Sequence, residues 1–248
     1  MHRPTDADLY RRGCQTLLAS WEEYARGALD AAVEHLPGVT AAVFPREPER
    51  DVYNNALLDR DLAARERTDA LESMAAVYAS AGVHRFAVWV HETDVAMRYD
   101  LERRGYALDT TTCAMGMVLD SSSTPRPEIE FVPADWSEYL SYERLPPNFL
   151  SRANHASLHV LVHRIDGDID SGALAYDFDG DCGIYNVGTI ELARRRGLAT
   201  AATAAQLRDA LARGCQTASL QSTPTAERIY TALGFRNLGR FLEYVPSR

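Results

Sequence analysis

The chain has 248 residues, a length that allows one large core or two small ones. Acidic residues outnumber basic residues by 35 to 26, and the formal net charge of −9 argues against nucleic acid as a partner. Every basic residue apart from histidine is an arginine, so no mechanism for this protein can use a lysine.

The first half of the chain alternates between helical and strand patterns. Apolar residues from Cys14 to Ala28 recur at helical spacing, which predicts a long amphipathic helix near the start. Strands are expected over 38–44 and 52–58. A helix over 66–82, a buried strand over 84–92, a helix over 93–105 and a strand over 109–119 complete this half.

A segment rich in serine and proline, "DSSSTPRPE", separates this half from the next. We interpret residues 121–127 as a linker between a domain over 1–120 and a domain over 128–248.

The second half begins with a short strand over 128–132 and a helix over 134–145. Three strands with tight turns follow over 157–165, 172–178 and 182–190, with Asp166-Gly167 at the first turn and Gly180 at the second. The end of the chain predicts a helix from about Leu198 to Arg213, a strand over 215–221, a helix over 223–234 and a strand over 235–245. This order predicts a mixed α/β fold.

The two halves end in the same order of elements: a helix, a glycine, a strand, a helix, a glycine with an aromatic residue, and a strand. This recurrence favours a duplicated domain over a chance match of common elements.

The stretch "TIELARRRGLATAA" lies where a strand passes into a helix, the place where an α/β sheet is expected to bind a ligand. Gly197 leaves room for a ligand beside the backbone, and the helix that follows directs its first N–H groups and its positive dipole end toward that turn. The stretch therefore predicts an anion site. The nucleotide-binding patterns GxxxxGK[ST] and GxGxxG are both absent from it.

Arg194-Arg195-Arg196-Gly197-Leu198-Ala199 resembles R/Q-x-x-G-x-G/A, the pyrophosphate-binding loop of the GNAT acetyltransferase superfamily. Downstream, "AERIYTALGF" resembles the family's A-x-x-[LI]-Y-x-x-x-G-F signature. The resemblance covers about 128–245 well, and the first half only through its last four elements. It implies two GNAT-like domains, each a twisted, mostly antiparallel mixed sheet flanked by helices.

The resemblance also implies acetyl-coenzyme A as the acyl donor. Backbone N–H groups of Arg195 to Thr200 would bind the pyrophosphate, and the arginines would neutralise its charge. The pantetheine arm would lie along the strand at 187–189, where a backbone N–H would polarise the thioester carbonyl. Thr223 stands where the family has an asparagine that contacts the pantetheine arm. The expected coenzyme A ligands are Val187, Gly188, Thr189, Arg194, Arg195, Arg196, Gly197, Leu198, Ala199, Thr200 and Thr223.

Tyr230 occupies the family's general-acid position, where a phenol can protonate the leaving thiolate. The alternative is a tyrosine packed in the core with its hydroxyl hydrogen-bonded. The general base is open, because Gly183 aligns with the family's carboxylate. Asp177, Asp179 and Asp181 lie at nearby strand ends, where turn formation is the commonest explanation.

No metal site is expected. "DGDIDSG" lacks the glycine of a calcium loop and fits a hairpin turn, and His155, His159 and His163 have no third kind of ligand nearby.

The first half has no arginine loop before the helix that ends at Gly82, and Leu101 aligns with Tyr230. We therefore expect a degenerate copy with a structural role.

Two functions are open. The first is an N-acetyltransferase that acts on a primary amine of a small molecule, supported by Tyr230. The second is a non-catalytic acyl-coenzyme A binding or sensing protein, supported by the missing carboxylate at Gly183. We expect a monomer or homodimer.

The four cysteines, Cys14, Cys113, Cys182 and Cys215, are far apart and form no CxxC pair, which favours reduced, packed thiols in a cytoplasmic protein. No apolar run approaches the ~18 residues that a membrane helix needs, and the first ten residues lack the apolar segment of a secretory signal. We expect a soluble, cytoplasmic protein that does not bind membranes.

Overall fold

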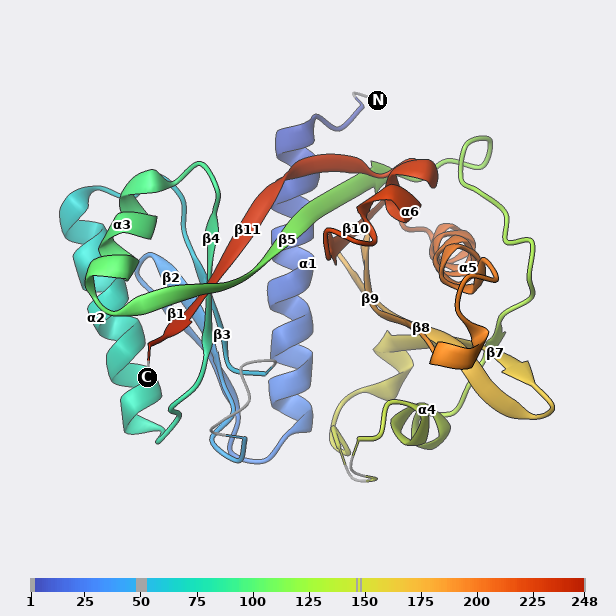
Figure 1. The fold of residues 1–248 in the computed structure, drawn as a ribbon, viewed down its shortest axis with the longest axis horizontal. Coiled ribbons are helices and arrows are strands. Elements are labelled where there is room, and N and C mark those ends of the chain that lie inside the picture. Colours follow the sequence, from blue (N-terminus) through green and yellow to red (C-terminus); the bar gives the residue numbers. More distant parts are fainter. Residues whose placement is uncertain (1–2, 48–52, 146, 148, 248) are drawn as a thin grey trace. The chain divides into compact units, whose positions relative to one another are not determined.

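A computed structural model describes residues 3–47, 53–145, 147 and 149–247 (Figure 1). The chain forms two compact units that do not follow the two halves of the sequence. The first unit contains Met1–Ser20, Cys113–Phe149 and Asn154–Leu238, and the second contains Trp21–Thr112, Leu150–Ala153 and Gly239–Arg248. The boundary differs from the predicted one because the last strand of each half pairs within the unit built mainly from the other half.

The second unit contains most of the N-terminal half. Its elements are the end of α1 (Asp6–Gly27), β1 (Ala32–Leu36), β2 (Val39–Val43), β3 (Asn55–Leu58), α2 (Ala64–Ser80), β4 (Ala87–His91), α3 (Val95–Arg103) and the first part of β5 (Tyr106–Val118). β3 and β4 are parallel, and α2 connects them. Tyr78, Met74 and Met97 lie at the centre of the core between helices and sheet. β1 was not predicted, and Val52 of the predicted strand 52–58 lies outside the described residues.

The first unit contains most of the C-terminal half. Its elements are the start of α1, the end of β5, β6 (Val132–Pro133), α4 (Trp136–Tyr142), β7 (Leu158–Ile165), β8 (Asp168–Phe178), β9 (Asp181–Thr189), α5 (Leu198–Arg213), β10 (Thr217–Ser222), α6 (Glu227–Ala232) and the first residues of β11 (Arg236–Pro246). Short 3-10 turns lie at His155–Ser157 and Glu191–Ala193. Of the predicted strand over 128–132, only Val132 lies in a strand, β6.

Tight turns set the register of β7, β8 and β9. Asp166 and Gly167 have φ of 51° and 95°, and Asp179 and Gly180 have φ of 45° and 74°. Two successive residues with positive φ form the two-residue turn whose twist matches that of antiparallel strands. The predicted hairpin at Asp166-Gly167 is confirmed by the pairing of Ile165 with Asp168.

The last strands of the two halves are exchanged. The end of β5 pairs antiparallel with β10, from Cys113 opposite Ser222 to Val118 opposite Thr217. β11, drawn in red in Figure 1, pairs antiparallel with β4 through residues 241–244. Each unit therefore completes its sheet with the strand that ends the other half of the chain.

Opposite faces of the first unit's sheet are covered by different helices. Ala218 and Leu220 of β10 share a core with α5 and α6. Ser219 lies between them and faces α1, since a side chain on Gly13 would contact it. Alanines along the buried side of α5 allow the helix to pack closely on the sheet. We call these two sides the α5 face and the α1 face.

Candidate active site

The parallel strands β9 and β10 separate after three paired residues. Thr217 pairs with Asp181, Ala218 with Cys182, and Ser219 with Gly183. β9 then continues to Thr189 and β10 to Ser222 without further pairing between them. We call this opening between the two strands the fork. It leaves the edge of β9 from Ile184 onward available for hydrogen bonds to another extended chain.

A bulge in β9 begins just beyond the fork. Gly172 of β8 pairs with Gly188, whereas Leu174 pairs with Tyr185, so Asn186 and Val187 together face the single residue between them on β8. Asn186 has a φ of 50°. Bulges bend a strand and reverse which side chains face each side of the sheet. Here Val187 packs toward the α5 face, while Gly188 lies against Tyr142 of α4.

A cavity of about 490 Å³ lies between β9, the arginine loop and the start of α5. The residues lining it are Val187, Gly188, Thr189, Ala193, Arg194, Arg195, Gly197, Leu198, Ala199, Thr200 and Ile229. The cavity therefore contains the end of β9, the first turn of α5 and one residue of α6.

The start of α5 has no side-chain cap. Gly197 is the N-cap, with a φ of 81°, and no side chain caps the helix there. Arg195 also has a positive φ, 62°, and the three arginine side chains are exposed. Successive N–H groups beside a left-handed residue form an anion-binding concavity, and the positive helix end adds to it. The loop therefore presents backbone donors and positive charge to one place.

Space beside Gly197 is open. A methyl group added at Gly197 would meet no atom within 4 Å. A second cavity of about 320 Å³ also borders Gly197, and Arg196 and the segment 125–129 line it. Packing within the protein therefore does not require a glycine here, whereas the positive φ favours one.

The structure brings most of the predicted coenzyme A ligands together. All except Arg196 and Thr223 line the first cavity, and Arg196 lines the second. Thr223 lies after β10 with its hydroxyl 3.1 Å from that of Thr225, and it lines neither cavity. Ile229 was not predicted as a ligand, although it is the apolar residue directly before Tyr230 in the quoted signature.

Tyr230 is buried in the core of the α5 face, with 9% of its surface exposed. Its ring lies 6.0 Å from that of Phe235, centroid to centroid, in an edge contact. Burial raises the pKa of the Tyr230 hydroxyl, which keeps it protonated at neutral pH. Its neighbour Ile229 reaches the cavity, but Tyr230 itself does not line it.

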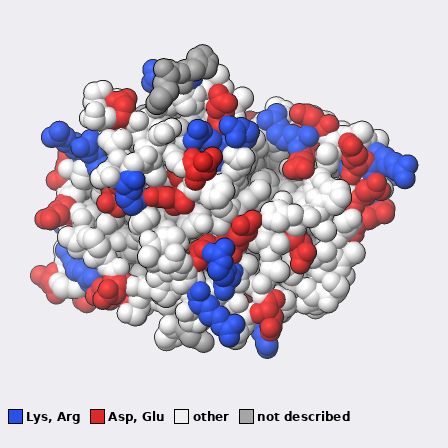
Figure 2. Space-filling view, turned by 180° about the vertical axis from the view of Figure 1, so that it is seen from behind, with Lys and Arg blue, Asp and Glu red and all other residues white. Residues whose placement is uncertain are grey.

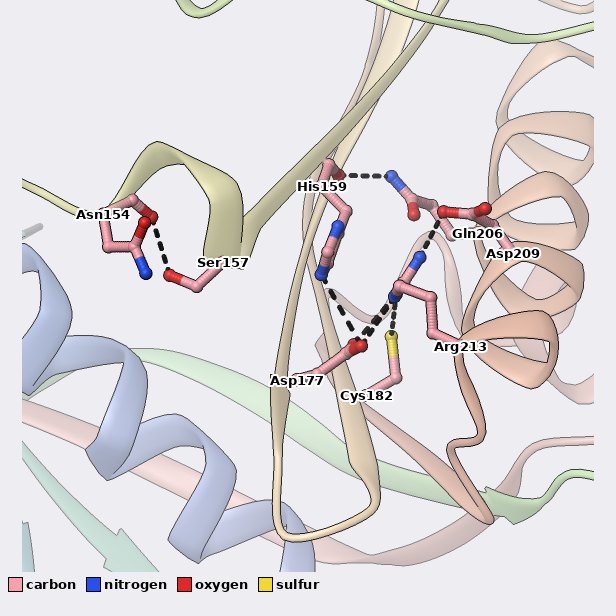
Figure 3. A network of polar contacts seen from close by, with 8 residues as sticks. All are labelled: Asn154, Ser157, His159, Asp177, Cys182, Gln206, Asp209 and Arg213. Carbon is pink, nitrogen blue, oxygen red and sulfur yellow. Dashed lines mark hydrogen bonds and ion pairs between the residues drawn. The ribbon is translucent and has the colours of Figure 1, made fainter.

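Two of the three aspartates that were considered as bases, Asp177 and Asp181, are held in side-chain contacts, and Asp179 is an exposed turn residue. Asp177 binds Arg213 of α5 through two hydrogen bonds of 2.6 and 2.8 Å (Figure 3). Burial opposes ionisation of Asp177, but Arg213 outweighs it and lowers the pKa of the carboxyl. Asp179 forms the β8–β9 turn. Asp181 is 2% exposed and accepts hydrogen bonds from the hydroxyls of Thr16, Thr217 and Ser219 at 2.6–2.8 Å.

Gln206 was missed by the sequence analysis. It is fully buried on α5, and its amide donates to the carbonyl of His159 at 2.8 Å (Figure 3) and to the carbonyl of Ala173 at 2.9 Å. A glutamine in an alanine-rich helix gives no signal of its own, because its partners lie on strands far away in the sequence. It fixes α5 to β7 and β8, and so holds the helix end that faces the cavity.

Residues 122–235 match the model of the acetyltransferase (GNAT) family. By this match, residues 122–235 form a GNAT-family domain. The predicted resemblance is therefore confirmed for the half that carries the arginine loop. Proteins of this family generally use acetyl-coenzyme A, so family membership supports an acetyltransferase activity for the GNAT domain.

Solved GNAT structures resemble the whole chain. A GCN5-related N-acetyltransferase from Kribbella flavida is 17% identical with a TM-score of 0.72, over 96% of this chain and 95% of that one. One from Sphaerobacter thermophilus is 17% identical with a TM-score of 0.59, over 98% and 93%. A tandem GNAT protein from the clavulanic acid biosynthesis pathway is 12% identical with a TM-score of 0.59, over 94% of each chain.

These likenesses confirm the predicted fold class, a mixed α/β fold with a mostly antiparallel sheet flanked by helices. None of the curated proteins compared with this sequence matches it. The degeneracy of the N-terminal half stays a prediction.

Within the described part of the chain, no helix is both long and apolar enough to cross a bilayer.

Proposed function

We propose that this protein transfers an acetyl group from acetyl-coenzyme A to a primary amine of a small molecule. The observation that carries the proposal is the cavity at the uncapped start of α5, where exposed arginines and backbone N–H groups meet the open edge of β9. A donor with an anionic end and an extended, amide-bearing arm matches these two features.

The donor fits the cavity in two parts. Its pyrophosphate would accept hydrogen bonds from the first turn of α5, with Gly197 leaving the space that the phosphates need. Its pantetheine arm would extend along 187–189 beside the edge of β9 that β10 leaves unpaired. The bulge turns Asn186 and Val187 out of the regular pairing with β8, which favours a backbone N–H from this segment as the donor to the thioester carbonyl.

Tyr230 is the candidate acid for the leaving thiolate. It lies on α6 directly beside Ile229, which lines the cavity, and its buried hydroxyl is protonated at neutral pH. Attack by a neutral amine on the thioester carbon breaks the C–S bond. The thiolate would take its proton from Tyr230, and the proton released by the nitrogen would return to the Tyr230 phenolate, which restores the acid.

A non-catalytic acyl-coenzyme A binding protein is the second candidate. It is favoured by one observation: Gly183, at the fork, has no carboxylate to activate an acceptor, and the nearby Asp177 and Asp181 are held in other contacts. Such a protein would bind coenzyme A at the same cavity without amine-dependent release of thiol.

The proposal also includes the absence of a nucleic-acid partner. It is supported by the net charge of −9 and by Figure 2, in which arginine and acidic side chains are interspersed over the face shown.

The test combines donor binding with turnover. Calorimetry measures coenzyme A affinity and stoichiometry for the full chain. Thiol release from acetyl-coenzyme A is then followed with spermidine, glucosamine, tyramine and a short peptide with a free amino terminus, and mass spectrometry identifies the acetylated product. Binding with amine-dependent release supports the enzyme. Binding without release for any amine supports the second candidate, and no binding contradicts both.

A further inference from the structure

The second cavity beside Gly197 has no role in the function proposed above. Its volume of about 320 Å³ lies at the lower end of the range of about 300–1,000 Å³ for small-molecule sites. Gly197 and Thr200 line both cavities, so the two meet at the first turn of α5. The other residues that line the second cavity are Pro125, Arg126, Pro127, Glu128, Ile129, Arg196, Ala201, Ala204 and Leu233.

The shape of the donor directs its far end to this cavity. In coenzyme A the pyrophosphate joins the pantetheine arm to a ribose that carries adenine and a 3′-phosphate. In the proposed function the arm lies along 187–189 and the pyrophosphate lies at the first turn of α5, so the ribose has to leave the pyrophosphate in a direction away from β9. The second cavity extends from that turn to Ala201 and Ala204, which lie farther along α5.

The walls of the second cavity combine apolar surface with positive charge. Ala201, Ala204 and Leu233 are buried and apolar. Arg126 and Arg196 are exposed, and neither forms an ion pair or a side-chain hydrogen bond within the part of the chain that the structure describes. Apolar side chains suit an adenine ring, and guanidinium groups bind phosphate through charge-assisted hydrogen bonds.

Arg126 belongs to the segment that the sequence analysis interpreted as a linker, and this segment passes beside α5 (Figure 1). Thr124, which is 4% exposed, anchors it through two hydrogen bonds with the backbone of Asp120, at 3.0 and 3.1 Å. Pro125 has a fixed φ, and Pro127 restricts the residue before it, Arg126, to extended conformations. The backbone that carries Arg126 therefore loses little conformational freedom when a ligand binds.

We propose that the second cavity binds the adenosine 3′-phosphate end of coenzyme A and that Arg126 contacts the 3′-phosphate. This inference rests on the proposed donor. Arg196 lines the same cavity and adds a second positive charge, whereas Glu128 opposes the phosphate with one negative charge. The linker thus takes part in donor binding, and the protein distinguishes coenzyme A from a donor that lacks the 3′-phosphate.

Calorimetry with coenzyme A and dephospho-coenzyme A is the direct test, because these two ligands differ only in the 3′-phosphate. The wild-type protein should bind coenzyme A about tenfold more tightly than dephospho-coenzyme A. Arg126→Ala should weaken the binding of coenzyme A about fivefold and leave that of dephospho-coenzyme A unchanged. Glu128→Gln removes a like charge and should increase the preference for coenzyme A.

Arg11→Ala is the matched control. Arg11 is an exposed arginine of α1, and its side chain donates to the side-chain oxygen of Gln15 at 3.0 Å. The substitution changes the net charge by the same amount as Arg126→Ala, but Arg11 lines neither cavity. It should leave the affinities for both ligands unchanged. A melting curve for each variant checks that the fold is retained.

The possible failures are distinguishable. Equal affinity of the wild-type protein for the two ligands would overturn the inference and leave the proposed donor in place. The inference would also be wrong if Arg126→Ala weakened both ligands equally, if Arg11→Ala had the same effect as Arg126→Ala, or if Glu128→Gln reduced the preference for coenzyme A. If neither ligand binds, the proposed function fails, and the role of the second cavity fails with it.

Discussion

Replacing Gly197 separates its role in the fold from its role in binding. Gly197 has a φ of 81°, and a side chain there would meet no protein atom within 4 Å. A residue with a Cβ costs about 1–2 kcal/mol in this left-handed conformation. Gly197→Ala and Gly197→Val should therefore destabilise the fold by about that amount, without a further clash inside the protein.

Gly214 provides the matched control at the other end of the same helix. It has a φ of 99°, and a side chain there also meets no atom within 4 Å. Gly214→Ala should therefore cost a similar free energy of unfolding. Gly214 lines neither of the two cavities that border Gly197, so the two variants differ in their position relative to the donor.

Substitution of Gly197 should weaken the affinity for coenzyme A, whereas substitution of Gly214 should not. A valine side chain would fill the space beside the backbone N–H groups and prevent one or two charge-assisted hydrogen bonds of about 1.5–3 kcal/mol each. At 1.4 kcal/mol per factor of ten, Kd should rise by at least about tenfold. Urea unfolding and calorimetric titration of the three variants give both quantities. Equal affinities for Gly197→Val and Gly214→Ala would show that the arginine loop is not the phosphate site.

Three other predictions concern the acid, a salt bridge and the exchanged strand. Tyr230→Phe should lower kcat by about 10²–10⁴-fold with little change in coenzyme A affinity; an unchanged kcat with a lower melting temperature would mean that the hydroxyl is only structural. Asp177→Asn should destabilise the protein by about 1–3 kcal/mol at pH 7. Arg213 lowers the folded-state pKa of Asp177 despite the burial of this carboxyl, so the salt bridge stabilises the fold fully above the unfolded-state pKa of Asp177. This stabilisation is lost as the pH falls through the folded-state pKa. Urea unfolding should therefore show the stabilities of the wild-type protein and Asp177→Asn converging at low pH. Deleting Gly239–Arg248 removes Leu242 and Tyr244 from the core of the second unit, so hydrogen exchange should show β4 losing protection first; unchanged protection of β4 would contradict the exchange of strands.

Local patterns in the sequence predicted the elements of the site well. The helix expected from about Leu198 to Arg213 has these bounds. Gly197 before it and Gly214 after it both have the left-handed conformation, which interrupts the helical backbone at each end. The arginine loop and the end of β9 could be placed together because they are adjacent in the sequence. Their meeting in one cavity follows from a strand that leads directly into a helix.

Contacts between distant residues could not be predicted in the same way. The position of the Tyr185 ring over Gly183 depends on the bulge at Asn186 and on the packing of α1. The alternation of residues in a strand pattern predicts neither of these. The domain boundary differed for a similar reason. The linker composition marks where the chain leaves one half, but hydrogen bonding between strands decides which unit the last strand joins.

The exchange of strands gives a reason to keep an N-terminal half that lacks the arginine loop. β10 borders the fork on one edge, and its other edge is paired over six residues with the end of β5, which the N-terminal half supplies. Without β5 that edge would expose unpaired backbone groups beside the site, at a cost in stability and a risk of aggregation. In the same way, β11, which ends the C-terminal half, pairs with β4 of the N-terminal half. The N-terminal half therefore cannot be removed without exposing this edge, because the strand that pairs with β10 beside the fork belongs to it.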